Sequence, residues 1–150
     1  MKFNTNKLEG VKVSPIFENE NYDSKLLEYT KSKELFIGKF NEIYVNLPYN
    51  GEKEILIGLG KRNELEEDQV REVFFKLVKV LAKHKEFEAQ ITLPKLENIP
   101  TQSIVNAAVE GALHATYKFD KYKSDRKDFP EITINLATEE KIDNIEDIVN

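Results

Sequence analysis

The chain has 150 residues, 22 of them Lys or Arg and 27 Asp or Glu, for a formal net charge of -5, with no Cys and no Trp. This length suffices for one globular domain over residues 1–150 with a full hydrophobic core, and the missing Cys excludes disulfides, thiolate metal sites and a cysteine nucleophile, which fits a cytoplasmic location. The acidic balance disfavours broad nucleic-acid binding, and no apolar run has the length of a signal peptide or a membrane span.

The first predicted element is a strand over Val11–Phe17, in which apolar residues recur at alternate positions. Pro15 lacks a backbone N–H, so it favours a sheet edge or a strand end for this segment. A short helix is expected next, between Asp23 and Glu34, where Leu26 and Leu27 begin a weak amphipathic pattern.

A β-hairpin is predicted for the following segment. Glu42–Leu47 alternates apolar and polar residues, the Asn50-Gly51 pair favours a tight turn, and Glu54–Leu59 is a second apolar run. Because Ile55, Leu56 and Ile57 are apolar in succession, this second run is expected to be a central strand that is covered on both faces.

The clearest helix is predicted over Glu64–Lys85. Asn63 is its expected N-cap, with Glu66 three residues on, and acidic residues begin the helix while lysines end it, which suits the helix dipole. One buried stripe follows the spacing of a helix face and consists of Val70, Val73, Phe74, Leu77, Val78 and Leu81.

A strand, a helix, a strand and a last helix are expected in the remaining chain. Phe87–Leu93 alternates as a strand that Pro94 ends, and Thr101–Phe119 has helical periodicity. Gly111 lies inside this helix, where Gly costs about 1 kcal/mol relative to Ala, so a close backbone contact is expected there. Ile132–Leu136 alternates as a further strand, and Thr138–Val149 is predicted to be the last helix.

Strands and helices that alternate in this way predict an α/β fold. The two long helices can serve as crossovers between parallel strands. We therefore expect three layers, with a mixed β-sheet and helices on both of its faces.

A phosphate-binding turn is one interpretation of Gly58-Leu59-Gly60-Lys61-Arg62. The two glycines lie between a buried strand and a helix start, where backbone N–H groups can cradle a phosphate. Neither the dinucleotide motif nor the P-loop motif is complete, because Asn63 stands where the former has a small residue and Arg62 follows Lys61 where the latter has Ser or Thr. A tight structural turn is the alternative, and it is favoured.

No catalytic residue and no metal ligand is predicted. His84 and His114 are the only histidines, and neither has a His or a carboxylate four residues on within its own helix. The basic segment Lys118–Lys127, which follows Tyr117, contains Asp120 and Asp125 and is followed by Asp128, so a solvated loop is favoured over a nucleic-acid contact.

Two segments resemble the N-terminal domain of the leucyl (cytosol) aminopeptidase family. One is ILIGLGKRNEL at Ile55–Leu65, and the other is AAVEGALHATYKFDKYKS at Ala107–Ser124. The order of strands and helices extends the similarity over Val11–Leu136. The resemblance implies a macro-domain-like α/β domain, joined in that family to a larger catalytic domain.

The resemblance implies that the reaction of that family takes place in another domain. Two divalent metals, zinc or manganese, are held in the catalytic domain by carboxylates and a Lys, and they activate the water that removes an N-terminal residue from a peptide. The family's Asn-Thr-Asp-Ala-Glu-Gly-Arg motif does not occur in this sequence. The expected role is therefore non-catalytic: the domain would help to assemble a hexamer and to shape access to the active sites, with the catalytic domain and sister subunits as partners.

Two alternative roles remain at this point. A stand-alone macro-like module would bind an ADP-ribose-type or other phosphate ligand at Gly58, Gly60, Lys61 and Arg62. Nucleic-acid binding through Lys118–Lys127 is a weaker third possibility.

Overall fold

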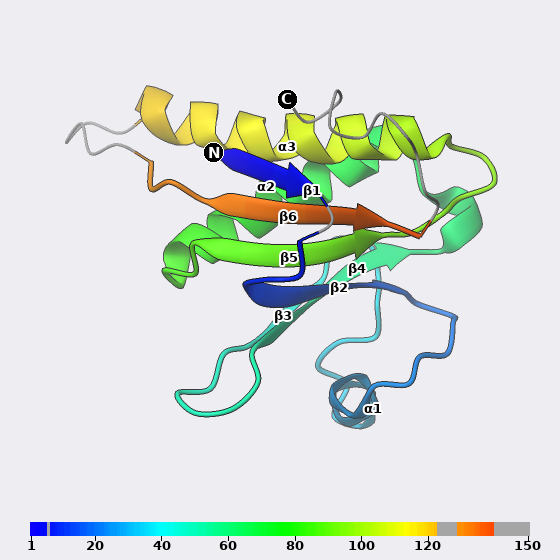
Figure 1. The fold of residues 1–150 in the computed structure, drawn as a ribbon. Coiled ribbons are helices and arrows are strands. Elements are labelled where there is room, and N and C mark those ends of the chain that lie inside the picture. Colours follow the sequence, from blue (N-terminus) through cyan, green and yellow to red (C-terminus); the bar gives the residue numbers. More distant parts are fainter. Residues whose placement is uncertain (6, 123–128, 140–150) are drawn as a thin grey trace.

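A six-stranded mixed sheet forms the centre of the protein (Figure 1). The computed structural model describes residues 1–5, 7–122 and 129–139, with side chains from 118 to 122 left undescribed. Five strands run parallel, and one edge strand, β3, pairs antiparallel with β4. The strands, in spatial order, are β1 (Lys2–Thr5), β6 (Thr133–Thr138), β5 (Glu88–Leu93), β2 (Val11–Phe17), β4 (Glu54–Gly60) and β3 (Ile43–Asn46).

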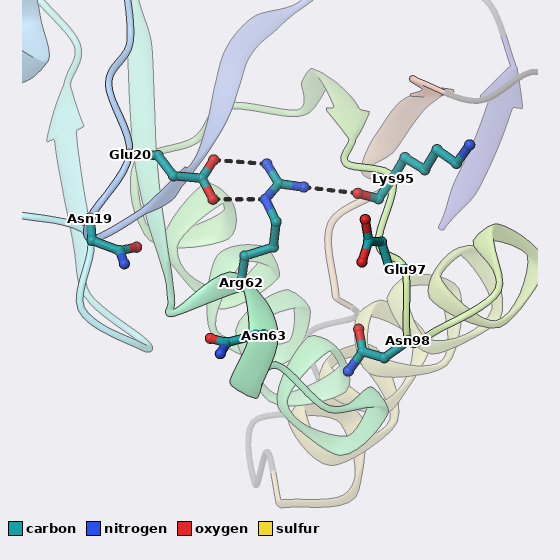
Figure 2. Close-up of a pocket in the computed structure, with 7 residues that line it drawn as sticks. All are labelled: Asn19, Glu20, Arg62, Asn63, Lys95, Glu97 and Asn98. Carbon is teal, nitrogen blue, oxygen red and sulfur yellow. Dashed lines mark hydrogen bonds and ion pairs between the residues drawn. The ribbon is translucent and has the colours of Figure 1, made fainter.

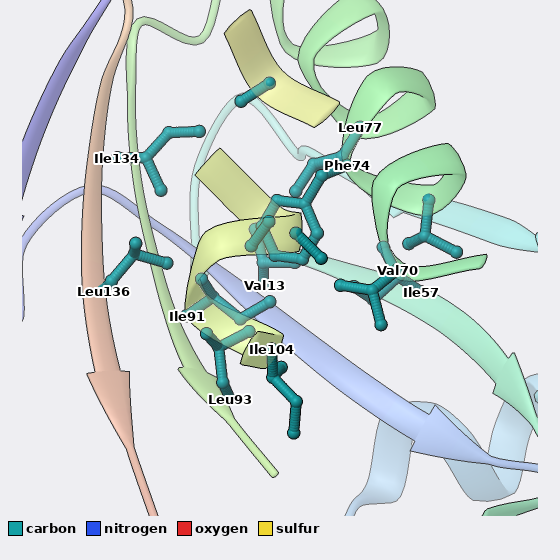
Figure 3. Close-up of a cluster of buried hydrophobic side chains, with 14 of the residues drawn as sticks. Val13, Ile57, Val70, Phe74, Leu77, Ile91, Leu93, Ile104, Ile134 and Leu136 are labelled. Carbon is teal, nitrogen blue, oxygen red and sulfur yellow. The ribbon is translucent and has the colours of Figure 1, made fainter. Parts of the chain in front are cut away.

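Helices cover both faces of the sheet, so the predicted α/β architecture is confirmed. The long helices α2 (Glu67–Lys83) and α3 (Thr101–Tyr122) pack against one face, and the short helix α1 (Lys25–Ser32) packs against the other. Ile55 and Ile57 of β4 belong to the large cluster under α2 and α3 (Figure 3), whereas Leu56 points to the small cluster under α1. Both faces of β4 are therefore covered, as its continuous apolar run predicts.

Strand β2 is internal to the sheet, so of the two positions predicted from Pro15, a sheet edge or a strand end, the sheet edge is wrong. It pairs with β4 on one side, and on the other side Val11, Lys12 and Val13 pair with β5. The pairing with β5 ends at Val13, two residues before Pro15, so the proline lies where β4 is the only paired neighbour. Pro15 marks the end of one ladder and not the edge of the sheet.

Helix α2 begins later than the sequence predicts, and Asn63 is not its N-cap. A short 3-10 turn spans Arg62–Glu64, and Leu65 then adopts an extended conformation with its side chain 1% exposed in the core. Glu66 is the N-cap, because its side chain accepts from the first turn while Gln69 accepts from the Glu66 N–H. Because Leu65 must be extended to reach the core, the first residue of helix α2 is Glu67 and not Glu64.

The expected close contact at Gly111 is confirmed. A Cβ at Gly111 would lie 2.2 Å from the carbonyl oxygen of Arg71, so α3 lies directly against the backbone of α2. The same two helices are also joined by a side-chain contact, in which the Arg71 guanidinium donates to the Glu110 carboxylate at 3.0 Å.

The other predicted elements agree with the structure, with small shifts at their ends. The hairpin, the helix after Asp23 and the strands near residues 88 and 133 are all present. Strand β1, which is four residues long, was not predicted, because Lys2–Thr5 is too short for a periodic pattern. Thr138 ends β6, and the rest of the predicted last helix, from residue 140, lies outside the described residues.

Candidate functional site

A polar cleft lies at the carboxyl ends of three neighbouring strands. The chain runs from β2 through α1 to β3 at one edge of the sheet, and from β5 through α3 to β6 on the other side. The connections after β2 and β5 therefore diverge. In open α/β sheets such a divergence forms the crevice in which ligands bind. The cleft has a volume of about 720 Å³ (Figure 2) and is lined by Asn19 and Glu20 after β2, Arg62 and Asn63 after β4, and Lys95, Glu97 and Asn98 after β5.

Arg62 connects all three loops around this cleft. Its Nε and Nη2 donate to the two carboxylate oxygens of Glu20 at 2.7 and 2.9 Å, and its Nη1 donates to the Lys95 carbonyl oxygen at 2.8 Å. Its guanidinium also lies 4.3 Å from the centre of the Phe17 ring, in a cation-π contact. Such a bidentate ion pair holds both side chains in one orientation and stabilises the charged form of each.

The same contacts shift the pKa values of the groups involved. The hydrogen bond from Arg62 lowers the pKa of Glu20 below its ordinary value, and that bond in turn raises the pKa of Arg62. Burial raises the pKa of Tyr22, whose hydroxyl oxygen accepts from the Phe17 N–H at 2.9 Å. Glu20 and Arg62 are therefore charged near neutral pH, and Tyr22 is neutral.

The two glycines of the predicted phosphate turn lie against another part of the chain. Gly58 donates its N–H to the Glu42 carbonyl at 2.7 Å, and Gly60 donates its N–H to the Gly38 carbonyl at 2.9 Å. A Cβ at Gly58 would lie 2.0 Å from the Lys39 carbonyl oxygen, and Gly60 has a φ of +74°. The packing of the chain therefore explains why both positions are glycine: a side chain at either one would keep the segment before β3 from approaching β4 closely.

Of the residues predicted for phosphate binding, only Arg62 lines the cleft. Lys61 is exposed beside it, and both glycine N–H groups already have acceptors within the chain. A phosphate at this position would have to use other donors, and phosphate binding stays a prediction. The sequence analysis missed Glu20 and Lys95. The loops that carry them lie side by side because β5, β2 and β4 are neighbours in the sheet, and no local sequence pattern shows this order.

The histidines are separated, and no metal-binding group occurs in the described parts of the chain. His84 caps the end of α2, and His114 is exposed on α3 with its ring 5.3 Å from that of Phe75. Residues 1–5, 7–122 and 129–139 hold no group of three or more His, Asp or Glu side chains arranged to bind a metal. Residues 118–122 continue helix α3, so the favoured loop is wrong for that part of Lys118–Lys127. The side chains of the segment lie outside the described ones, so the disfavoured contact with nucleic acid is untested. No described helix is both long and apolar enough to cross a membrane.

The chain belongs to the cytosol aminopeptidase family, whose N-terminal domain model matches residues 7–126. A probable cytosol aminopeptidase of Treponema denticola is 42% identical over 151 aligned positions, which cover 100% of this chain and 32% of that protein. One of Clostridium tetani is 32% identical and is matched over 99% of this chain and 32% of its own length. The chain therefore spans about a third of the length of these relatives.

Solved structures share the fold at low sequence identity. A tomato leucine aminopeptidase mutant matches 99% of this chain and 34% of its own, with a TM-score of 0.69 and 11% identity. The bottromycin maturation enzyme BotP, in complex with Mn, matches 93% of this chain and 28% of its own, with a TM-score of 0.67 and 15% identity. The resemblance to the N-terminal domain that the sequence indicates is thus confirmed for family and fold.

Proposed function

We propose that this chain is the non-catalytic N-terminal domain of a cytoplasmic aminopeptidase that removes N-terminal amino acids from peptides. The family match carries this proposal, because residues 7–126 match the model of the N-terminal domain and the relatives extend far beyond the matched part. In the proposal, residues 1–150 form one domain that helps subunits to assemble and shapes access to active sites formed by a catalytic domain.

The metals of the reaction would be bound by that catalytic domain. The described residues offer no set of side chains that fits one divalent metal, and still less two. A structural relative, BotP, carries Mn. When bound, zinc or manganese would polarise the peptide carbonyl and activate water, so the proposal assigns no step of the reaction to a side chain of this chain.

Two assays test the proposal. The pure chain, incubated with a leucine anilide and Mn²⁺, should show only background hydrolysis, and metal-dependent turnover would refute the non-catalytic role. In the second assay this chain replaces the matched third of the Treponema denticola relative. We expect the chimera to recover the oligomer size and activity of that relative, whereas an unrelated α/β domain of similar size in its place should recover neither. Equal results for the two chimeras would refute the assembly role.

A second candidate function is the binding of an ADP-ribose-type or other phosphate ligand. The cleft after β2, β4 and β5 supports it, because its volume of about 720 Å³ and its position suit a nucleotide-sized ligand. Arg62 in this cleft is already paired with Glu20, so a phosphate must either displace that carboxylate or use the two remaining N–H groups of the guanidinium close to its negative charge. Calorimetry with ADP-ribose tests this function, and no heat at millimolar ligand would exclude it.

A further inference from the structure

We propose that the free edge of β3 pairs with the β3 edge of a second copy of this chain, which joins two sheets about a two-fold axis. This inference specifies the surface for the assembly role proposed above. Strand β3 pairs only with β4 in the described sheet, and among the described residues no backbone group outside that ladder bonds to Ile43–Asn46.

The hydrogen bonds around Gly58 establish which groups of β3 point outward. The Gly58 N–H donates to the Glu42 carbonyl, and the Gly58 carbonyl accepts from Asn41, so the backbone of Gly58 faces β3. Since these directions alternate along a strand, Leu56 also faces β3, and its partner Tyr44 bonds inward. Ile43 and Val45 therefore direct their N–H and C=O groups toward the free edge.

These outward groups are self-complementary in one antiparallel register. A two-fold axis perpendicular to the sheet places the α2–α3 face of one copy beside the α2–α3 face of the other. Residues that pair across the axis must therefore have side chains on the same face of the joined sheet. With the axis at Tyr44, Ile43 pairs with the partner's Val45, and Val45 pairs with the partner's Ile43. Each pair exchanges two hydrogen bonds, and the two Tyr44 residues form the close pair between them.

The strand has none of the usual features that prevent edge pairing. It contains no charged residue, no Pro and no paired-strand irregularity over its four residues, and all four side chains are half-buried. The opposite edge strand, β1, begins with the exposed Lys2. Ile43 and Val45 already pack at the border of the main core, and Tyr44 packs at the border of the small cluster, so pairing would extend both clusters across the axis.

The contact is too short to hold two free domains together tightly. A four-residue strand spans only about 13 Å, so its edge buries far less than the area of about 1,600 Å² that a standard stable interface buries. The isolated chain should therefore dimerise only in the high micromolar to millimolar range, and the contact would become strong when other parts of an assembly hold two copies together.

A cysteine placed at the axis tests the register directly. The chain has no Cys, so Tyr44→Cys creates a single thiol. At the axis the two Cα atoms would lie about 4.5 Å apart, within the range that a disulfide spans. The matched control is Tyr49→Cys at the tip of the same hairpin, where the native side chain is fully exposed. Under mild oxidation we expect Tyr44→Cys to form a disulfide dimer several times faster than Tyr49→Cys.

A proline variant tests the hydrogen bonds. Val45→Pro removes an N–H that β4 does not use, and Tyr44→Pro, as a control, removes one that β4 does use. Val45→Pro should keep the circular dichroism of the native chain and weaken dimerisation by about tenfold, because two hydrogen bonds per dimer are lost. Equal crosslinking at the two cysteine positions, or a chain that stays monomeric at millimolar concentration, would overturn the edge pairing. Either result would leave the aminopeptidase proposal standing, since that proposal is tested by activity and by the chimera.

Discussion

Replacing Gly111 by Ala tests the contact between α2 and α3. A Cβ at this position would lie 2.2 Å from the Arg71 carbonyl oxygen, whereas ordinary contacts begin near 3.4 Å, so the helices must separate by about 1.2 Å. The overlap is with backbone, so we take the upper part of the range for overpacking, about 3 kcal/mol. Alanine returns about 1 kcal/mol through its better helix propensity. The net loss of unfolding free energy is therefore about 2 kcal/mol.

Urea and thermal unfolding measure this loss. For a chain of this length, 2 kcal/mol lowers the Tm by about 4–8 °C, and the urea midpoint should fall with no change in the m-value. Asn106→Ala is the matched control, because Asn106 is exposed on the same helix and the change gains up to about 0.7 kcal/mol in helix propensity. If Gly111→Ala is as stable as the native chain, the contact between the two helices is looser than we describe.

Two further predictions concern the cleft and helix α1. The pKa of Glu20 lies below its ordinary value of 4.5 because Arg62 donates to it, so its carboxylate stabilises the fold above that value, and this contribution disappears as pH falls through the lowered pKa. The stability difference between the native chain and Glu20→Gln, followed by urea unfolding, should therefore be constant near neutral pH and shrink in acid; a difference that does not change down to pH 3 would contradict it. Ser24→Ala removes the hydroxyl that accepts from the Leu27 N–H at 3.1 Å, which should cost about 1 kcal/mol, whereas Ser32→Ala at the exposed end of α1 should change the unfolding free energy by less than about 0.5 kcal/mol.

The sequence predicts most of the fold because the periodic apolar pattern of its long elements matches their burial. The stripe on α2 and the run Ile55–Ile57 are buried as expected. The errors concern features that depend on neighbours in space. Pro15 suggests a sheet edge or a strand end, yet β2 is internal, and the proline is tolerated because the ladder to β5 ends before it. Asn63 suggests a cap, yet the burial of Leu65 moves the helix start.

The candidate site is less predictable than the fold. Gly58 and Gly60 suggest a phosphate turn, since glycine is needed both where a backbone meets a ligand and where it meets another segment of chain. In the structure the close neighbours are Lys39 and Phe40. The pairing of Glu20 with Arg62 joins residues 42 positions apart, and no local pattern reports such a contact.

The state of Arg62 also separates the two candidate functions. All three of its hydrogen bonds end on groups of this chain, and they connect the loops after β2, β4 and β5. A domain that serves as a scaffold gains from this arrangement, because it holds the carboxyl ends of the strands in one geometry without a ligand. A phosphate-binding module would lose affinity through it, since a ligand must either break a bidentate ion pair with strong hydrogen bonds or bind beside the negative charge of Glu20. The arrangement therefore favours the scaffold, and Glu20→Gln should improve binding of ADP-ribose only if the cleft is a true phosphate site.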